Sequence, residues 1–246
     1  MKNLNRSLSF EKLPQLLPDC TISNQLLAQE EQASGLLMKS AALLPEIIEV
    51  ILSDDDLADS IALNSYLHPN GFGKIVLAHS NLDRTRLRLH IWPETSSRPR
   101  HEGDLHDHRW PFVSLPILGR FTETRFAEVG EKSEVPGDPV YLYHCHPRHG
   151  RDRLYLQGCI KSRLTQVFEA ERIPGKSYSC EAGEIHRFEP SSPGLAITLV
   201  LTGDPAANAA KVYRETVIPD EESTIPAPTM TKLELKQLLS IVLRKM

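Results

Sequence analysis

Short β-prone runs fill the middle of the chain and limit the fold more than any other feature. In residues 86–92, Leu87, Leu89 and Ile91 alternate with charged or polar side chains, which is the two-residue period of a strand. Similar runs occupy residues 74–79, 112–126, 140–145, 155–160, 164–170, 177–180 and 195–201. Gly119 is expected to bend residues 112–126 into two strands. Helical crossovers do not interrupt the series, which disfavours a parallel sheet and predicts a mainly β sandwich or barrel.

The two ends of the chain differ from this middle. Leucines at roughly helical spacing predict two or three amphipathic helices in residues 20–64, with Pro45 at a tolerated helix start and Ser53 as an N-cap. Residues 215–230 are rich in proline and acids and are expected to form an exposed linker, and Thr231 is expected to cap a short C-terminal amphipathic helix. The predicted units are a helical region (1–64), a β region (65–214) and a linker with its helix (215–246).

Composition excludes several classes of function. The net charge is −4 and acidic and basic residues are interspersed, so the chain offers no basic stripe for nucleic acid. It lacks a run of about 18 apolar residues that could span a membrane, and a secretory signal pattern at the N-terminus. The scattered cysteines Cys20, Cys145, Cys159 and Cys180 do not resemble a disulfide framework. We therefore expect a cytoplasmic protein with reduced thiols.

Two histidines separated by one residue, His106 and His108, are the strongest chemical signal. Alternate side chains of a strand share a face, so both imidazoles could bind one metal ion while Asp107 points away. His186, which precedes a further β-prone run, is the third candidate ligand. Three neutral imidazoles leave the charge of a divalent metal uncompensated, which favours an anionic substrate that chelates the metal.

Residues 62–204 resemble the cysteine dioxygenase-type cupins. That family carries a Gly/His-rich loop, H-D-H, a strand ending in L-x-G-x-x-x-E-x-x-[YF], and a third histidine in G-x-H-R-[VF]-E-[NP]. The matching positions are His101, residues 106–108, residues 118–126 and residues 183–190. The resemblance implies a cupin barrel (a double-stranded β-helix, or jelly roll) with an insertion at about 130–165. It also implies mononuclear non-haem iron(II), with nickel, zinc, manganese or copper as alternatives, and a reaction with dioxygen.

This chain departs from the family pattern at the positions where the family binds its substrate. Where the family holds a substrate carboxylate with the arginine of Tyr-x-Arg, this chain has His68, and the family's Ser-x-His-x-Tyr run is matched by Thr198, Val200 and Thr202. The residues that could replace these groups are Arg88, Arg109 and Arg187, each of which could equally be a surface or structural arginine. We take His68, Arg109 and Arg187 as the candidate catalytic residues.

The sequence thus predicts an iron(II)-dependent oxygenase that acts with dioxygen on a small anionic substrate other than free cysteine. The alternatives are a metal-dependent isomerase, lyase or hydrolase that does not use dioxygen, and a non-catalytic ligand-binding cupin. The sequence also leaves the oligomeric state open, and a homodimer is one possibility.

Other polar residues near these motifs have weaker signals. His144, His146 and His149 form a second histidine group, either a second metal site or a polar hairpin at the barrel mouth. Glu184 precedes His186 by two residues and could share its face. His90 and Trp92 are expected to pack or to line the pocket.

Overall fold

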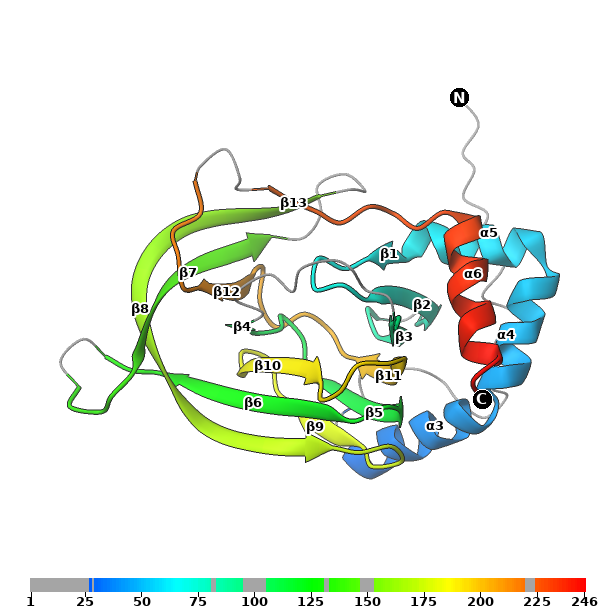
Figure 1. The fold of residues 1–246 in the computed structure, drawn as a ribbon, viewed down its shortest axis with the longest axis horizontal. Helices are drawn as coiled ribbons and strands as arrows, with labels where there is room; N and C mark the ends of the chain where they lie inside the picture. The colour runs from blue at the N-terminus through cyan, green and yellow to red at the C-terminus, as the bar shows by residue number, and fades with distance from the viewer. Residues whose placement is uncertain are drawn as a thin grey trace.

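The protein is mainly β, as predicted, and consists of two antiparallel sheets with helices at both ends of the chain (Figure 1). The computed structural model describes residues 27, 29–80, 83–94, 105–130, 133–146, 153–219 and 224–246. The helices are α3 (Glu30–Ala42), α4 (Leu44–Ser53), α5 (Asp55–Asn64) and α6 (Lys232–Leu243).

The first sheet has six strands and lies next to the helices (Figure 1). Its order is β1 (Tyr66–Leu67), β2 (Gly73–His79), β3 (Arg86–Trp92), β11 (Ala196–Thr202), β5 (Phe112–Leu118) and β9 (Tyr178–Cys180). The predicted bend at Gly119 is confirmed, because this residue has a φ of 79° and separates β5 from β6 (Phe121–Glu128). A Cβ atom there would lie 2.8 Å from the Cβ of Ala196, so the close approach to β11 also requires glycine.

The second sheet has seven strands and closes on itself, because β7 also pairs with β8. Its order is β13 (Thr224–Pro226), β8 (Arg153–Arg172), β6, β10 (Ile185–Pro190), β4 (Leu105–His106), β12 (Ala210–Arg214) and β7 (Asp138–His146). The 20-residue strand β8 bends so that its first half pairs with β7 and its second half with β6 (Figure 1). This double pairing leaves β4 and β10 in the interior of the sheet, with partners on both sides.

The largest hydrophobic core lies between the helices and the outer face of the six-stranded sheet. Side chains from all four helices pack there against alternate residues of β2, β3, β5 and β11. On β3 these are Leu87, Leu89 and Ile91, which are fully buried, and the residues between them point to the other face of the sheet. That other face is directed toward the second sheet, so Arg88 and His90 lie inside the protein, whereas Arg86 at the start of β3 is exposed.

Several local details differ from the sequence predictions. Asp54, rather than Ser53, caps α5 by accepting a hydrogen bond from the backbone N–H of Leu57 at 3.0 Å. One strand, β8, replaces the two strands predicted at 155–160 and 164–170, and the strands β1, β10, β12 and β13 were not predicted. Residues 215–230 are not exposed throughout, because Ala227 and Met230 are buried and β13 pairs with β8.

The predicted cap of α6 is confirmed as a reciprocal capping box. Thr231 Oγ1 accepts a hydrogen bond from the Glu234 N–H at 3.2 Å, and Glu234 Oε2 accepts one from the Thr231 N–H at 2.8 Å. Thr231→Ala should lower the free energy of unfolding by about 0.5–2 kcal/mol, because it removes the side-chain acceptor. Urea denaturation measures the change, with Thr231→Ser as the control that keeps the hydroxyl. Equal losses in both variants would contradict the capping role.

Two further findings concern the membrane-span and cysteine predictions. No described helix is long and apolar enough to cross a membrane. Cys145, Cys159 and Cys180 are free thiols, as predicted, whereas Cys20 lies outside the described residues.

Candidate metal centre

His106 and His186 are brought together by strand pairing. His106 ends β4, His186 is the second residue of β10, and the two are directly opposite each other in the antiparallel register. Directly opposed residues on neighbouring strands project their side chains from the same face of the sheet. Residues 80 apart in the sequence therefore present their imidazoles to the same space.

Backbone contacts hold His108 beside this pair although β4 ends at His106. The carbonyl of His108 accepts a hydrogen bond from the N–H of Gly183 at 3.0 Å, which ties the H-D-H segment to the turn before β10. Asp107 is fixed to β12, because its N–H donates to the Lys211 carbonyl and its Oδ1 accepts from the Lys211 N–H. The strand alternation that was predicted for residues 106–108 is thus replaced by a loop anchored on both sides.

The three imidazoles are close enough to share one metal ion. Their ligand atoms all lie within 4.8 Å of one another, and His108 Nε2 is 3.1 Å from His186 Nε2. Two nitrogens that bind one metal at about 2.1 Å stand roughly 3.0–3.4 Å apart in octahedral or tetrahedral geometry, so this pair has a suitable separation. Among the described residues, no other group of three or more histidine, cysteine or acidic side chains is arranged in this way.

Two adjoining cavities meet at the histidines. An outer cavity of about 600 Å³ is lined by His106 and His108, and an inner chamber of about 70 Å³ is lined by all three histidines. Both are also lined by His68, Lys74, Arg88 and Trp110. The rest of the inner chamber is walled by aromatic and small side chains and by two further polar residues: Phe72, Trp92, Phe112, Tyr178, Phe188, Ser114, Thr198, Val200, Thr202, Asn70 and His90.

The inner chamber contains polar atoms that lack a partner. Among the described residues, Arg88 Nε, His90 Nε2 and Thr198 Oγ1 are buried without a hydrogen bond. Buried polar groups are nearly always hydrogen-bonded, to protein or to water or ligand, so these atoms favour a polar occupant. Burial, reinforced by the neighbouring His106 and His186, lowers the pKa of His108 well below its usual value. The neutral imidazole is the form that binds metals.

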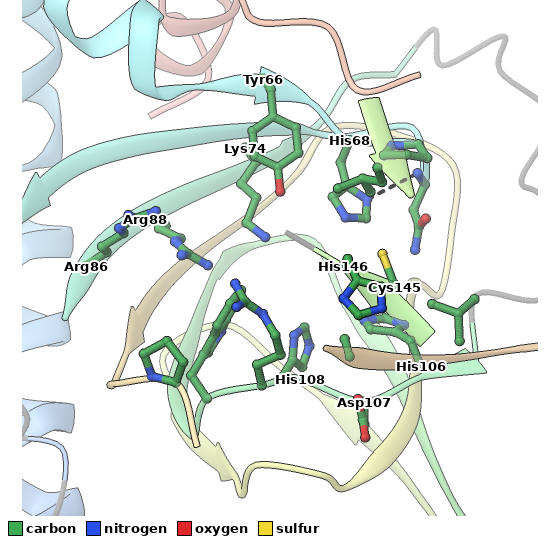
Figure 2. A pocket seen from close by; sticks show the side chains of 18 of the residues that line it. Tyr66, His68, Lys74, Arg86, Arg88, His106, Asp107, His108, Cys145 and His146 are labelled. Carbon is green, nitrogen blue, oxygen red and sulfur yellow. Dashed lines mark hydrogen bonds between the residues drawn. The ribbon is translucent and has the colours of Figure 1, made fainter. Parts of the chain in front are cut away.

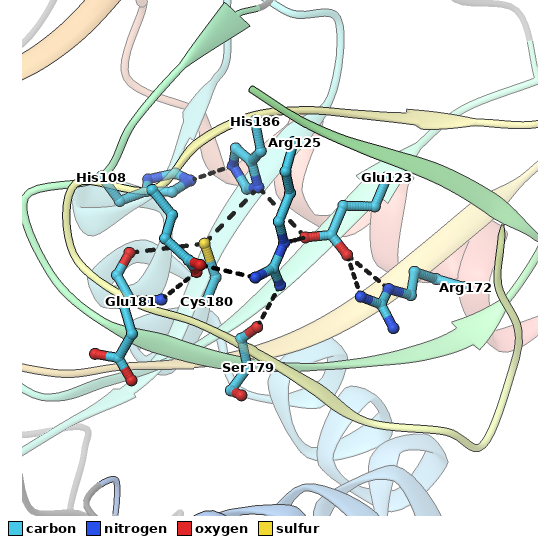
Figure 3. Close-up of polar contacts among 9 residues, drawn as sticks. His108, Glu123, Arg125, Arg172, Ser179, Cys180, Glu181 and His186 are labelled. Atoms are coloured by element: carbon cyan, nitrogen blue, oxygen red, sulfur yellow. Dashed lines mark hydrogen bonds and ion pairs between the residues drawn. The ribbon is translucent and has the colours of Figure 1, made fainter. Parts of the chain in front are cut away.

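Behind His186 lies a network of charged side chains around the buried Glu123 (Figure 3). Glu123 is completely buried, and its Oε1 lies 3.9 Å from His186 Nδ1. The same carboxylate pairs with Arg125, at 2.8 Å from its Nε, and with Arg172, whose Nε donates to Oε2 at 2.6 Å. Although burial raises the pKa of Glu123, the nearby His186 and the hydrogen bonds from Arg172 and Arg125 outweigh this effect and lower the pKa to about 2. The negative charge therefore stays beside the outer nitrogen of His186.

The candidate catalytic residues occupy different places. Arg109 lines the outer cavity and stacks over Trp110, with its guanidinium carbon 4.9 Å from the ring centroid. His68 is held by stacking on Phe72, with 4.4 Å between ring centroids. Burial and the nearby Lys74 lower the pKa of His68 well below its usual value, so its imidazole is neutral. Arg187 adjoins His186 on β10 and does not line either cavity.

The weaker candidates are also placed. Glu184 is engaged with Arg125 at 2.8 Å and with the N–H of Glu181 at 2.7 Å, instead of joining the histidines. His146 lines the outer cavity, and His144 lies on the same strand, β7. His149 lies outside the described residues, as does His101, so a second metal site stays a prediction. His90 and Trp92 line the inner chamber.

Two functional features were not predicted from the sequence. Lys74 was assigned only to a strand, yet its side chain reaches the histidine cavities. Glu123 was noted only within a family motif, and its contact with His186 was not foreseen. The signal for Glu123 was its position two residues before Arg125, because residues at this spacing share a strand face.

Comparison of the sequence with protein-family models and with curated proteins finds no significant match in either case. The arguments about function therefore rest on the site itself, a cluster of three histidines inside a two-sheet β fold.

Proposed function

We propose that this chain is a cupin-type metalloenzyme, an iron(II)-dependent oxygenase that acts on a small anionic substrate. The observation that carries the proposal is the three-histidine cluster at the meeting point of two cavities whose shared wall is cationic. Iron and dioxygen come from the resemblance to the cysteine dioxygenase-type cupins. When bound, such a metal would supply positions where substrate and dioxygen coordinate side by side.

The wall charges support an anionic substrate. Lys74, Arg86, Arg88 and Arg109 all line the outer cavity. The carboxylate in that wall, Asp107, is already bound to the backbone of Lys211. Together with a divalent metal held by neutral imidazoles, these cations would attract an anion and repel a cation.

The same charges argue against free cysteine. Cysteine carries an ammonium group, which would have to enter a chamber bounded by Lys74 and Arg88. His68, at the position of the family's carboxylate-holding arginine, is neutral and stacked on Phe72. Val200 and Thr202 line the inner chamber at the positions of the family's histidine and tyrosine, which makes that wall less polar.

Oxygen uptake by the iron-loaded protein tests this proposal. Cysteine and 3-mercaptopropionate form a matched pair, because they differ only by the ammonium group. We expect kcat/KM for cysteine to fall well below the ordinary enzyme range of about 10⁴ M⁻¹s⁻¹ and below the value for the ammonium-free acid. A wider screen of enolisable and aromatic acids would then seek the best substrate.

The same screen separates the rival functions. Consumption of a substrate without oxygen uptake would replace the oxygenase with a metal-dependent lyase or isomerase. Efficient turnover of cysteine would show that the cationic wall does not select against the ammonium group. A protein that binds acids but does not change them would be a ligand-binding cupin.

A further inference from the structure

Lys74 and Arg88 are buried cations on neighbouring strands. Their side chains are 7% and 5% exposed, and Arg88 is paired with Val76 in the register of β2 and β3. Both point from the inner face of the six-stranded sheet toward the space in front of His106 and His108 (Figure 2). They line the outer cavity as well as the inner chamber, so they stand where the two cavities join.

Neither cation has an anionic partner among the described residues. Lys74 Nζ lies 5.5 Å from the ring centroid of Tyr66 and 5.8 Å from that of Trp110, and the Arg88 guanidinium lies 4.8 Å from the Trp110 centroid. Arg88 Nε has no hydrogen-bond acceptor. Such ring contacts compensate only part of the desolvation free energy of two buried cations.

The electrostatic environment agrees with this geometry. Burial, together with Arg88, Arg86 and Arg109, lowers the pKa of Lys74 well below its ordinary value. Burial lowers the pKa of Arg88 to about 10, which leaves the guanidinium charged at neutral pH. The lowered pKa of Lys74 means that its surroundings disfavour its charged form, and an anion bound between Lys74 and Arg88 would favour that form.

We propose that Lys74 and Arg88 form a subsite for an oxyanion group of the substrate, remote from the group that meets the metal. The substrate class is then a small acid with two anionic groups, the second being a carboxylate or a phosphate. The metal end of this assignment rests on the proposed function, whereas the cation pair itself does not require a metal. The outer cavity of about 600 Å³ has room for a molecule longer than cysteine.

Anion binding to the metal-free full-length protein tests the subsite independently of the metal. Isothermal titration in low-salt buffer would use inorganic phosphate in one arm and succinate in the other, because the two arms separate a phosphate group from a carboxylate. We expect at least one of them to bind, and Lys74→Met or Arg88→Met to weaken binding roughly tenfold or more. Arg120→Met is the control, because it removes the same charge from a side chain that is 61% exposed and lines neither cavity.

Thermal melting supplies a second measurement. If Lys74 and Arg88 bind an anion, Lys74→Met and Arg88→Met should each raise the melting temperature in anion-free buffer. Each variant should also lose the stabilisation that phosphate or succinate gives the wild type. Lys74→Arg should retain that stabilisation because it keeps the charge. The assignment is overturned if the wild type binds neither anion at about 10 mM, or if the Met variants bind as tightly as Arg120→Met does. A variant that fails to fold would itself point to a structural role for that cation.

Discussion

Replacing His186 by alanine is expected to remove nearly all of the metal from the protein purified with iron(II). His186 is one of the three histidines that could hold the metal, and even the loss of a residue that only supports a ligand weakens metal affinity by about 10–100-fold. Loss of the ligand itself should therefore weaken it by roughly a hundredfold or more. Elemental analysis of the purified protein gives the metal content per chain, and circular dichroism shows whether the variant is folded.

A matched histidine replacement makes this result specific. His144→Ala changes a half-buried histidine on β7 that is not part of the cluster, so we expect it to keep one metal per chain. If His186→Ala kept its metal while His144→Ala lost it, the metal would belong to the second histidine group. His106→Ala should behave like His186→Ala, and it replaces a less buried side chain.

Glu123→Gln is expected to have the largest effect on stability. The variant keeps the shape of the side chain but leaves Arg125 and Arg172 without the carboxylate between them. Removal of one member of a buried ion pair typically costs about 3–5 kcal/mol. Glu171→Gln is the control, because the Arg120–Glu171 pair is 61% and 49% exposed and should contribute less than about 1 kcal/mol. Denaturant unfolding at neutral pH measures both.

The pH dependence of unfolding provides an independent test of Glu123. Its folded pKa of about 2 lies below the ordinary value of 4.5, so its contribution is complete above pH 4.5 and is lost as the pH falls toward 2. A difference of this size corresponds to about 3 kcal/mol. The wild type should therefore lose more stability than Glu123→Gln between these pH values. Parallel pH profiles for the two proteins would show that Glu123 is not stabilised by its arginines.

The candidate site could be predicted from the sequence only in part. The gathering of His106, His108 and His186 was anticipated from the H-D-H spacing and the family resemblance. The strand period of residues 86–92 was also correct, because an alternating pattern depends only on local side-chain direction. That pattern separates two faces of a strand but does not say which face meets water. The location of Arg88 inside the protein depends on helices that are far away in the sequence.

The short elements were missed for a different reason. A strand such as β1 has two residues, which is too short to show a period, and it forms because β2 lies beside it. The contacts of Glu123 with His186 and Arg172 were overlooked because these partners come from other strands, and long-range contacts leave no mark in a local pattern.

The division between the two faces of the six-stranded sheet has a consequence for how this protein can change over time. Its helices hold the apolar side of the sheet, so much of the burial that keeps the chain folded is independent of the side chains around the histidines. Substitutions at positions such as Thr198, Val200 or Thr202 alter the inner chamber while leaving that packing in place. The fold can therefore tolerate changes in the lining of this chamber, and selection for a different bound molecule can proceed without first rebuilding the core.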